Sequence, residues 1–321
     1  MGFRCLSLVF LTVAVALLAL PLKTVAAQES GNDAATVKVS GATIDVTLPD
    51  GPMRLSRDEL LGWVHGAANA VAGYYGRFPV PHLTLKIQSY SGAGIRHGVT
   101  YPKDGGLILV SIGREADLAA TKNDWVLVHE MIHLAFPSMP DDQHWIEEGI
   151  STYVEPVARV RVGLMSIDEM WRSFIFDMHK GEPEDGDHGL DNTHTWGRTY
   201  WGGAIFCLLA DVRIRERTKN RKGLEDALRG INQGGGNITE DWNIDKALVL
   251  GDKATGTTVL RDLYHEMRDK PAPVDLDQLW KKLGVSVKDA AIQFNDKAPE
   301  AHIRKAIAVA PSSAGASAGQ R

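Results

Sequence analysis

Cysteine is nearly absent from this chain of 321 residues, which contains only Cys5 and Cys207. Cys5 lies in an N-terminal segment that we expect to be removed, and the single remaining cysteine cannot form an internal disulfide. Cys207 lies in the apolar stretch 204–210. Its position favours a buried, inert thiol over a metal ligand or a nucleophile.

Basic residues are fewer than acidic ones: the chain has 35 Lys and Arg residues and 40 Asp and Glu residues, which gives a formal net charge of -5. The acidic balance and the lack of a basic stripe argue against binding to nucleic acid. The chain is 44% hydrophobic and 23% charged, which is sufficient for a substantial core.

The N-terminus has the features of a signal peptide. Arg4 precedes an apolar run at 6–22, and Val25-Ala26-Ala27 resembles a cleavage site. We expect cleavage after Ala27, export to the periplasm or the medium, and no stable membrane association of the mature protein. The alternative is an uncleaved anchor, because about 17 apolar residues approach the length that spans a bilayer.

The most informative motif is His129-Glu130-Met131-Ile132-His133. Apolar flanks and the following Pro137 predict that it lies on a helix. At about 3.6 residues per turn, histidines four positions apart share a face and can bind one metal ion. Glu130 lies beside that face, where it can act as general base on a bound water. The motif therefore predicts metal-assisted hydrolysis, and these ligand types suit zinc.

A third histidine at the spacing HExxHxxGxxH is missing, and the next histidine is His144. A lone histidine is more often structural or exposed, so His144 is left outside the predicted site. A second helix is predicted at 145–153, and it contains Glu147 and Glu148. From the residues alone, either carboxylate can be the third ligand.

The stretch Trp145-Ile146-Glu147-Glu148-Gly149 resembles the W-x-x-E-G setting of the gluzincin metallopeptidases. Among these, the chain is most similar to the glycyl aminopeptidases, peptidase family M61. The resemblance spans roughly residues 57–290, with specific motifs only in 129–215. It implies that Glu148, directly before the glycine, binds one zinc ion together with His129 and His133.

Tyr200 enters the predicted site through the same resemblance. The families carry Y-x-x-G-A before an apolar helix that ends L-D-x-x-I-R, and this chain has Tyr200-Trp201-Gly202-Gly203-Ala204 followed by the helix-like run 208–215. The resemblance assigns Tyr200 the role of oxyanion donor. A phenol beside the zinc can donate a hydrogen bond to the developing oxyanion while the metal polarises the same oxygen.

Arg96 departs from the family pattern. Residues 89–97 lie where the relatives have a glycine-rich strand ending G-L-E-H, and Arg96 replaces the glutamate. An aminopeptidase needs negative charge to receive the α-amine of its substrate, and Arg96 would repel that amine. Arg96 could instead receive a carboxylate, pair with an acid or point to solvent. An endopeptidase therefore stays open beside an aminopeptidase.

Residue periodicity predicts strands at 37–39, 43–48, 83–88, 98–101 and 107–111. A helix is predicted at 57–75, and the helix with the histidines should begin near Lys122. Further helices are expected at 166–179, 199–217, 224–231, 257–267 and 287–294. The acidic stretch 181–191 lacks the EF-hand spacing and should be a solvated loop.

This order predicts an α+β protein with a zincin (thermolysin-like) catalytic fold, in which a β-rich N-terminal lobe precedes a mainly helical lobe. The expected parts are a signal peptide (1–27), a β-rich lobe (28–116), a catalytic helical region (117–220), a C-terminal helical region (221–310) and a flexible tail (311–321).

The sequence thus predicts an exported zinc-dependent metallopeptidase, aminopeptidase-like, that hydrolyses peptides or proteins with a zinc-activated water. Glu130 is the expected general base and Tyr200 the expected oxyanion donor. One alternative is an endopeptidase of the same fold. The other is a non-catalytic, zinc-stabilised binding module of the cell envelope, which would need neither Glu130 nor Tyr200.

Overall fold

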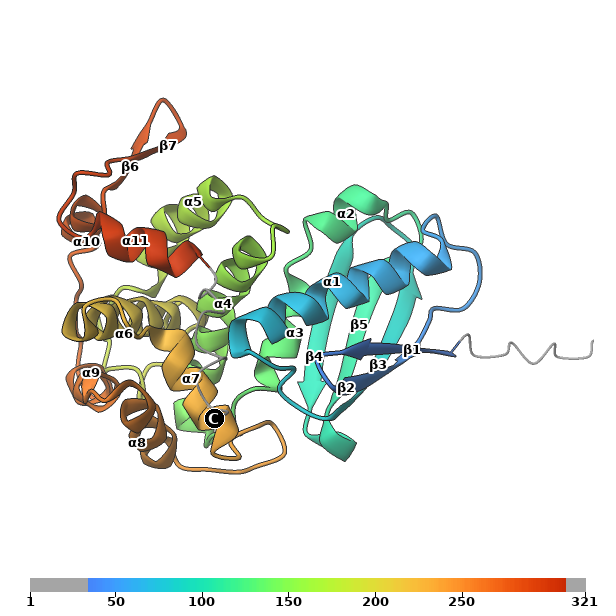
Figure 1. Ribbon diagram of the computed structural model, residues 1–321, viewed down its shortest axis with the longest axis horizontal. Coiled ribbons are helices and arrows are strands. Elements are labelled where there is room, and N and C mark those ends of the chain that lie inside the picture. Colours follow the sequence, from blue (N-terminus) through green and yellow to red (C-terminus); the bar gives the residue numbers. More distant parts are fainter. Residues whose placement is uncertain (1–33, 310–321) are drawn as a thin grey trace, which may run out of the picture. The chain divides into compact units, whose positions relative to one another are not determined.

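The computed structural model describes residues 34–309, so the expected signal peptide and tail lie outside the described residues. The described residues all belong to one compact unit. A five-stranded sheet comes first, and the rest is helical apart from one hairpin (Figure 1). The expected order of a β-rich region and a mainly helical region is confirmed. None of the described helices is long and apolar enough to cross a membrane.

The sheet has the strand order β1-β2-β3-β5-β4. Its strands are β1 (Ala34–Val39), β2 (Ala42–Thr47), β3 (His82–Tyr90), β4 (Ile95–Tyr101) and β5 (Leu107–Gly113). β3 pairs in parallel with β2 and β5, whereas β1 and β4 are antiparallel to their neighbours. Alternate residues of β3 are buried, as expected when one face lies on the core. β4 is an edge strand, the position from which an extended peptide can be bound.

Helix α1 (Arg57–Tyr75) connects the parallel strands β2 and β3 and has the predicted bounds. In Figure 1 it crosses one face of the sheet. It begins with a capping box, in which Ser56 and Glu59 each accept a backbone N–H of the other, and it ends at Gly76 with φ 78°. These local signals explain why both ends could be predicted.

The helix with the two histidines is α3 (Val126–His133), and a separate short helix, α2 (Leu118–Lys122), precedes it. The predicted start near Lys122 is therefore wrong. Asp124 lies between the two helices, and its carboxylate accepts the backbone N–H groups of Val126 and Leu127 at 2.9 and 3.2 Å. This side-chain cap begins a new helix where a continuous one was expected.

The remaining helices are α4 (His144–Arg161), α5 (Ile167–Asp177), α6 (Gly203–Thr218), α7 (Leu224–Gln233), α8 (Ile244–Thr255), α9 (Val259–Met267), α10 (Leu276–Leu283) and α11 (Ala301–Ala308). The helix predicted at 287–294 is wrong, because β6 (Val285–Lys288) and β7 (Ala291–Phe294) form a hairpin there. Its two turn residues, Asp289 and Ala290, have φ of 50° and 61°. Two successive positive φ values are typical of a tight hairpin turn and incompatible with a helix.

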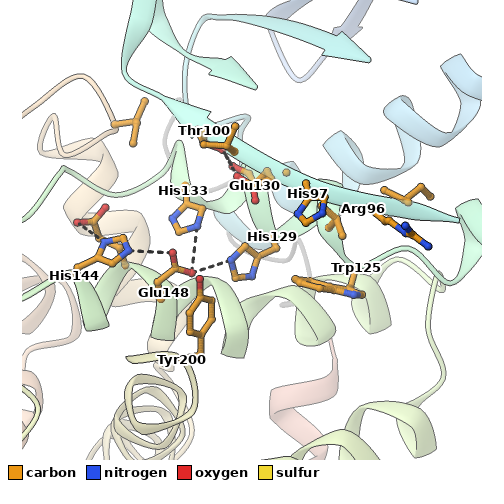
Figure 2. A pocket seen from close by; sticks show the side chains of 16 residues that line it. Arg96, His97, Thr100, Trp125, His129, Glu130, His133, His144, Glu148 and Tyr200 are labelled. Carbon is orange, nitrogen blue, oxygen red and sulfur yellow. Dashed lines mark hydrogen bonds and ion pairs between the residues drawn. The ribbon is translucent and has the colours of Figure 1, made fainter. Parts of the chain in front are cut away.

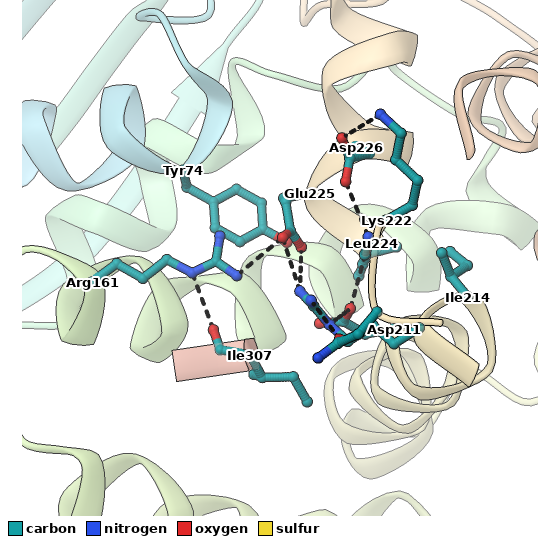
Figure 3. A network of polar contacts seen from close by, with 12 residues as sticks. Tyr74, Arg161, Asp211, Ile214, Lys222, Leu224, Glu225, Asp226 and Ile307 are labelled. Atoms are coloured by element: carbon teal, nitrogen blue, oxygen red, sulfur yellow. Dashed lines mark hydrogen bonds and ion pairs between the residues drawn. The ribbon is translucent and has the colours of Figure 1, made fainter. Parts of the chain in front are cut away.

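A buried ionic network joins the helices (Figure 3). Arg215 on α6 donates to Asp211, four residues earlier, at 2.8 Å and to both oxygens of Glu225 on α7 at 2.8 Å. Arg161 on α4 lies 3.5 Å from Glu225. Asp211 and Arg215 are the acid and the base of the run that resembles L-D-x-x-I-R. In this fold they form a structural ion pair.

Replacing Asp211 by Ala should lower the free energy of unfolding by about 3–5 kcal/mol, because Arg215 would remain buried without its partner on the same helix. Urea denaturation followed by circular dichroism measures the change. Glu266→Ala is the matched control, since it breaks the Arg213–Glu266 pair (2.9 Å), whose partners are both substantially exposed, and should cost at most about 1 kcal/mol. Equal losses in the two variants would show that the buried network contributes no more than a surface pair.

Candidate active site

The structure brings the three predicted metal ligands together (Figure 2). Glu148 Oε2 on α4 lies 3.1 Å from His129 Nε2 and 3.7 Å from His133 Nε2, both on α3. One ligand atom from each residue lies within 4.8 Å of the others. Two imidazole nitrogens and a carboxylate oxygen at this separation fit a zinc ion, for which they are the common catalytic ligand types.

Glu147, the other carboxylate considered from the sequence, has a different partner. Its Oε1 accepts the backbone N–H of Met139 at 2.8 Å. This hydrogen bond ties the connection between α3 and α4 to the first turn of α4. The structure thus separates the two carboxylates, with Glu148 beside the histidines and Glu147 holding the loop.

His144 lies behind Glu148, a contact that the sequence analysis missed. Its Nε2 lies 3.2 Å from Glu148 Oε1, the oxygen opposite the one that faces His129, and its Nδ1 lies 3.8 Å from Glu147 Oε1. Hydrogen bonds to Glu147 and then Glu148 raise the pKa of His144 to about 10. The available signal was the spacing, because residues 144 and 148 share one helix face.

The environment of the group suits metal binding. Burial lowers the pKa of His133 to about 3, which keeps the imidazole neutral, as a metal ligand must be. Burial alone would raise the pKa of Glu148, but hydrogen bonds with His129 and His144 outweigh it and hold that pKa well below its ordinary value. Glu148 is therefore ionised while His133 is neutral.

Glu130 is held by strand β4. The Thr100 hydroxyl lies 2.7 Å from Glu130 Oε2 and 2.9 Å from the Glu130 carbonyl oxygen. Burial raises the pKa of Glu130, which makes its carboxylate a stronger base. Gly98 makes room for this side chain, since a Cβ at position 98 would lie 2.3 Å from Glu130 Cγ. Gly98 and Thr100 thus fix the position of the predicted base.

Gly98→Ala should reduce hydrolytic turnover by about 100-fold, because the new methyl group must displace Glu130, and a shift of about 1 Å at a catalytic group costs that much. The zinc content should stay that of the wild type, since the atoms nearest to the new methyl group all belong to Glu130. Turnover and zinc content are measured on the same preparations. Gly62→Ala on α1 is the control, because a Cβ there meets nothing within 4 Å. Loss of zinc from Gly98→Ala would contradict a role limited to Glu130.

Strand β4 has a bulge beside the cleft. Its pairing with β5 shifts between Arg96 and Gly98, and His97 has φ 47°. Arg96 is exposed, lies at the cleft and places its guanidinium 5.0 Å from the centre of the Tyr90 ring. A bulge in an edge strand re-aims side chains near a site. Arg96, rather than the glutamate of the family pattern, therefore lies at this end of the cleft, with its guanidinium against Tyr90.

Tyr200 lies on a π-helical turn, η4 (Gly197–Gly202), which leads into α6. Its ring stacks on that of His129, with centroids 6.3 Å apart, and its hydroxyl points toward Glu148 (Figure 2). Burial, followed by the charge of Glu148, raises the pKa of Tyr200 to about 12. The phenol therefore keeps its proton at neutral pH and can donate a hydrogen bond.

Two glycines explain how Tyr200 comes to lie beside Glu148. A Cβ on Gly149 would lie 2.3 Å from the carbonyl carbon of Gly203, and a Cβ on Gly203 would lie 2.3 Å from the carbonyl oxygen of Trp145. The backbones of α4 and α6 therefore touch at a crossing that admits no side chain. The glycines of W-x-x-E-G and Y-x-x-G-A are the two halves of this crossing.

The turn with Tyr200 is anchored by an ion pair that the sequence analysis did not foresee. Arg198 Nε lies 2.7 Å from Asp187 Oδ2, and both side chains are buried. Arg198 also donates to the carbonyl of Gly181 at the end of η3 (Met178–Gly181). The expectation of a solvated acidic loop at 181–191 is wrong at Asp187, which is turned inward by its basic partner. Because Asp187 and Arg198 are eleven positions apart, their ion pair produces no recognisable local pattern in the sequence.

The candidate site opens into a cavity of about 740 Å³. Its wall includes the three candidate ligands, Glu130, Tyr200 and the edge strand β4. The volume is within the range of about 300–1,000 Å³ that ligand pockets occupy. A metal-binding group, a buried base and a phenol donor thus face one cleft that runs along a free strand edge of the described sheet.

The sequence matches no family model and no curated protein. A crystal structure of an aminopeptidase N family protein from Idiomarina loihiensis is similar, with a TM-score of 0.61 and 13% identity, over 79% of this chain and 49% of that one. An M1 zinc metallopeptidase from Deinococcus radiodurans has a TM-score of 0.47 and 14% identity, over 75% of this chain and 54% of that one. The chain therefore spans about half the length of these proteins.

The similarity to the aminopeptidase N family protein shows the fold of this chain. At 13% identity, it shows nothing beyond the fold. That neighbour is an aminopeptidase N family protein, so the finer expectation of peptidase family M61 is not confirmed. The described part of this chain has the fold of that aminopeptidase N family protein.

Proposed function

We propose that this chain is an exported zinc-dependent peptidase that hydrolyses peptide bonds in peptides or proteins. The observation that carries the proposal is the convergence of His129, His133 and Glu148 with Glu130 in one cleft of a fold similar to that of an aminopeptidase N family protein. One zinc ion bound there would act as a Lewis acid toward water and the substrate carbonyl.

The residues of the chain then have separate tasks. Glu130 takes the proton of the attacking water and returns it to the leaving amine. Tyr200 donates its hydroxyl proton in a hydrogen bond to the oxygen that gains negative charge. His144 holds Glu148 Oε1, so that Oε2 stays turned toward the histidines. Such an outer partner orients a metal ligand and supports its affinity.

Two features bear on where the peptide is cut. The W-x-x-E-G and Y-x-x-G-A motifs support an enzyme related to the glycyl aminopeptidases, which remove N-terminal residues. Arg96 at the cleft supports the second candidate, an endopeptidase, because a cation there disfavours a free α-amine nearby. We propose an aminopeptidase-like enzyme first and an endopeptidase second.

Export is proposed from the N-terminal sequence alone, since 1–27 lies outside the described residues. Loss of this segment would remove Arg4 and Lys23, change the formal charge from -5 to -7 and leave Cys207, which is buried. N-terminal sequencing of protein recovered from the periplasm or the medium tests the proposed cleavage after Ala27.

The activity is tested by mass spectrometry of a diverse peptide mixture incubated with the zinc-loaded protein and, in parallel, with Glu130→Gln. Loss of single N-terminal residues would establish an aminopeptidase despite Arg96, and internal cuts would establish an endopeptidase. If neither protein changes the mixture, the peptidase proposal is wrong and the zinc-stabilised binding module replaces it.

A further inference from the structure

A second cavity, of about 490 Å³, adjoins the candidate active site. Trp125, His129 and Tyr200 line both cavities, so these side chains lie between the two. The far wall carries Trp196 and Trp201. We call the space lined by Trp125, Trp196, Tyr200 and Trp201 the aromatic pocket. The aromatic pocket therefore lies next to the candidate metal group, on the other side of these shared side chains.

Three rings of the aromatic pocket are joined in a continuous series of ring contacts through His129, a candidate metal ligand. Tyr200 stacks on His129, and Trp196 stacks on Tyr200 with centroids 5.8 Å apart and an interplanar angle of 27°. Trp125 meets His129 edge-on at 5.5 Å. Trp196 and Trp125 are 61% and 54% exposed. Large apolar side chains exposed in one concave site are typical of binding surfaces.

The acidic and basic side chains in the wall are paired with one another. Arg159 donates to Glu155 at 2.8 Å, and Lys180 donates to Asp177 at 2.5 Å. The Lys180 ammonium also lies 6.0 and 5.8 Å from the ring centres of Trp196 and Trp201. Because these charges already have partners, the exposed aromatic surface of Trp125 and Trp196 is the part of the wall most open to a ligand. An uncharged, apolar occupant fits this wall better than a charged one.

We propose that the aromatic pocket is a specificity site, which binds a large apolar side chain, preferably aromatic, of the residue next to the cleaved bond. This inference rests on the proposed peptidase activity. Aromatic side chains bury about 150–250 Å² each and gain further from stacking on rings. Tyr200 then has two tasks, because its hydroxyl faces the reacting carbonyl while its ring forms part of the pocket wall.

The first test compares kcat/KM for peptide pairs that differ only by Phe or Ala beside the cleaved bond. The wild type should favour Phe by at least about tenfold, and Trp196→Ala should reduce that ratio to nearly one. A mere disturbance of Tyr200 would slow both peptides equally and leave the ratio intact. Phe176→Ala, another exposed aromatic residue that is not part of the pocket wall, should leave the ratio unchanged. An unchanged ratio in Trp196→Ala would overturn the proposal.

The second test needs no turnover. Fluorine NMR follows binding of N-acetyl-para-fluorophenylalaninamide, with the corresponding alanine amide as competitor. The wild type should bind the aromatic probe, the alanine amide should not displace it, and Trp196→Ala should lose it. If the wild type cuts no peptide but binds the probe in this way, the proposed activity fails while the aromatic pocket stands. If peptides are cut and the probe does not bind, the aromatic pocket is wrong and the activity stands.

Discussion

Replacing Glu130 by Gln is expected to lower kcat for peptide hydrolysis by about 10²–10⁴-fold, the contribution of a positioned general base. Gln keeps the shape of the side chain and an oxygen that can accept the Thr100 hydroxyl, which lies 2.7 Å from Glu130 Oε2. It cannot accept a proton from water. The loss should therefore fall on kcat, with KM and zinc content near the wild-type values.

Glu147→Gln is the matched control for this variant. Glu147 lies in the same cleft, and Gln at this position can still accept the N–H of Met139. Its turnover should remain within a few-fold of the wild type, whereas Glu130→Gln should lose about 10²–10⁴-fold. Equal losses in the two variants would mean that Glu130 matters through the charge of the cleft and not as a base.

Replacing Glu148 by Gln is expected to weaken zinc binding strongly and to abolish peptide hydrolysis. Loss of a residue that only orients a metal ligand lowers metal affinity by about 10–100-fold, and loss of a ligand itself should cost more. The reason is the loss of the anionic ligand that faces both histidines, at 3.1 and 3.7 Å. Competition with a zinc-binding dye measures the affinity. Excess zinc should restore part of the activity to Glu148→Gln and none to Glu130→Gln.

The same pair of neighbouring glutamates gives the control for Glu148→Gln. Glu147→Gln should bind zinc like the wild type, since Glu147 holds a backbone N–H of the loop. If Glu147→Gln loses zinc and Glu148→Gln keeps it, the assignment of the third ligand is reversed.

Local signals made parts of this account predictable from sequence. Helix α1 has its predicted bounds because Ser56 and Glu59 cap its start and Gly76 ends it. The two histidines of α3 share a face for the simple reason that they lie four residues apart. The choice of Glu148 over Glu147 required a family resemblance, since both carboxylates lie on the predicted second helix.

Contacts between distant segments could not be read from the sequence. Thr100 holds Glu130 across thirty residues, and Asp187 anchors Arg198 from a loop that looks solvated. A helix was predicted where β6 and β7 form a hairpin. The turn of this hairpin requires positive φ at Asp289 and Ala290, and residues other than glycine seldom have positive φ. Each of these features depends on tertiary packing or on an uncommon backbone conformation, which residue periodicity does not encode.

The central claim is that one zinc ion binds to His129, His133 and Glu148. Anomalous diffraction at the zinc edge, from crystals of the zinc-loaded protein, tests it most directly. The account predicts one strong peak at about 2.0–2.2 Å from a nitrogen of each histidine and from an oxygen of Glu148. A peak bound by Glu147, or strong peaks elsewhere with none between the two histidines, would contradict it.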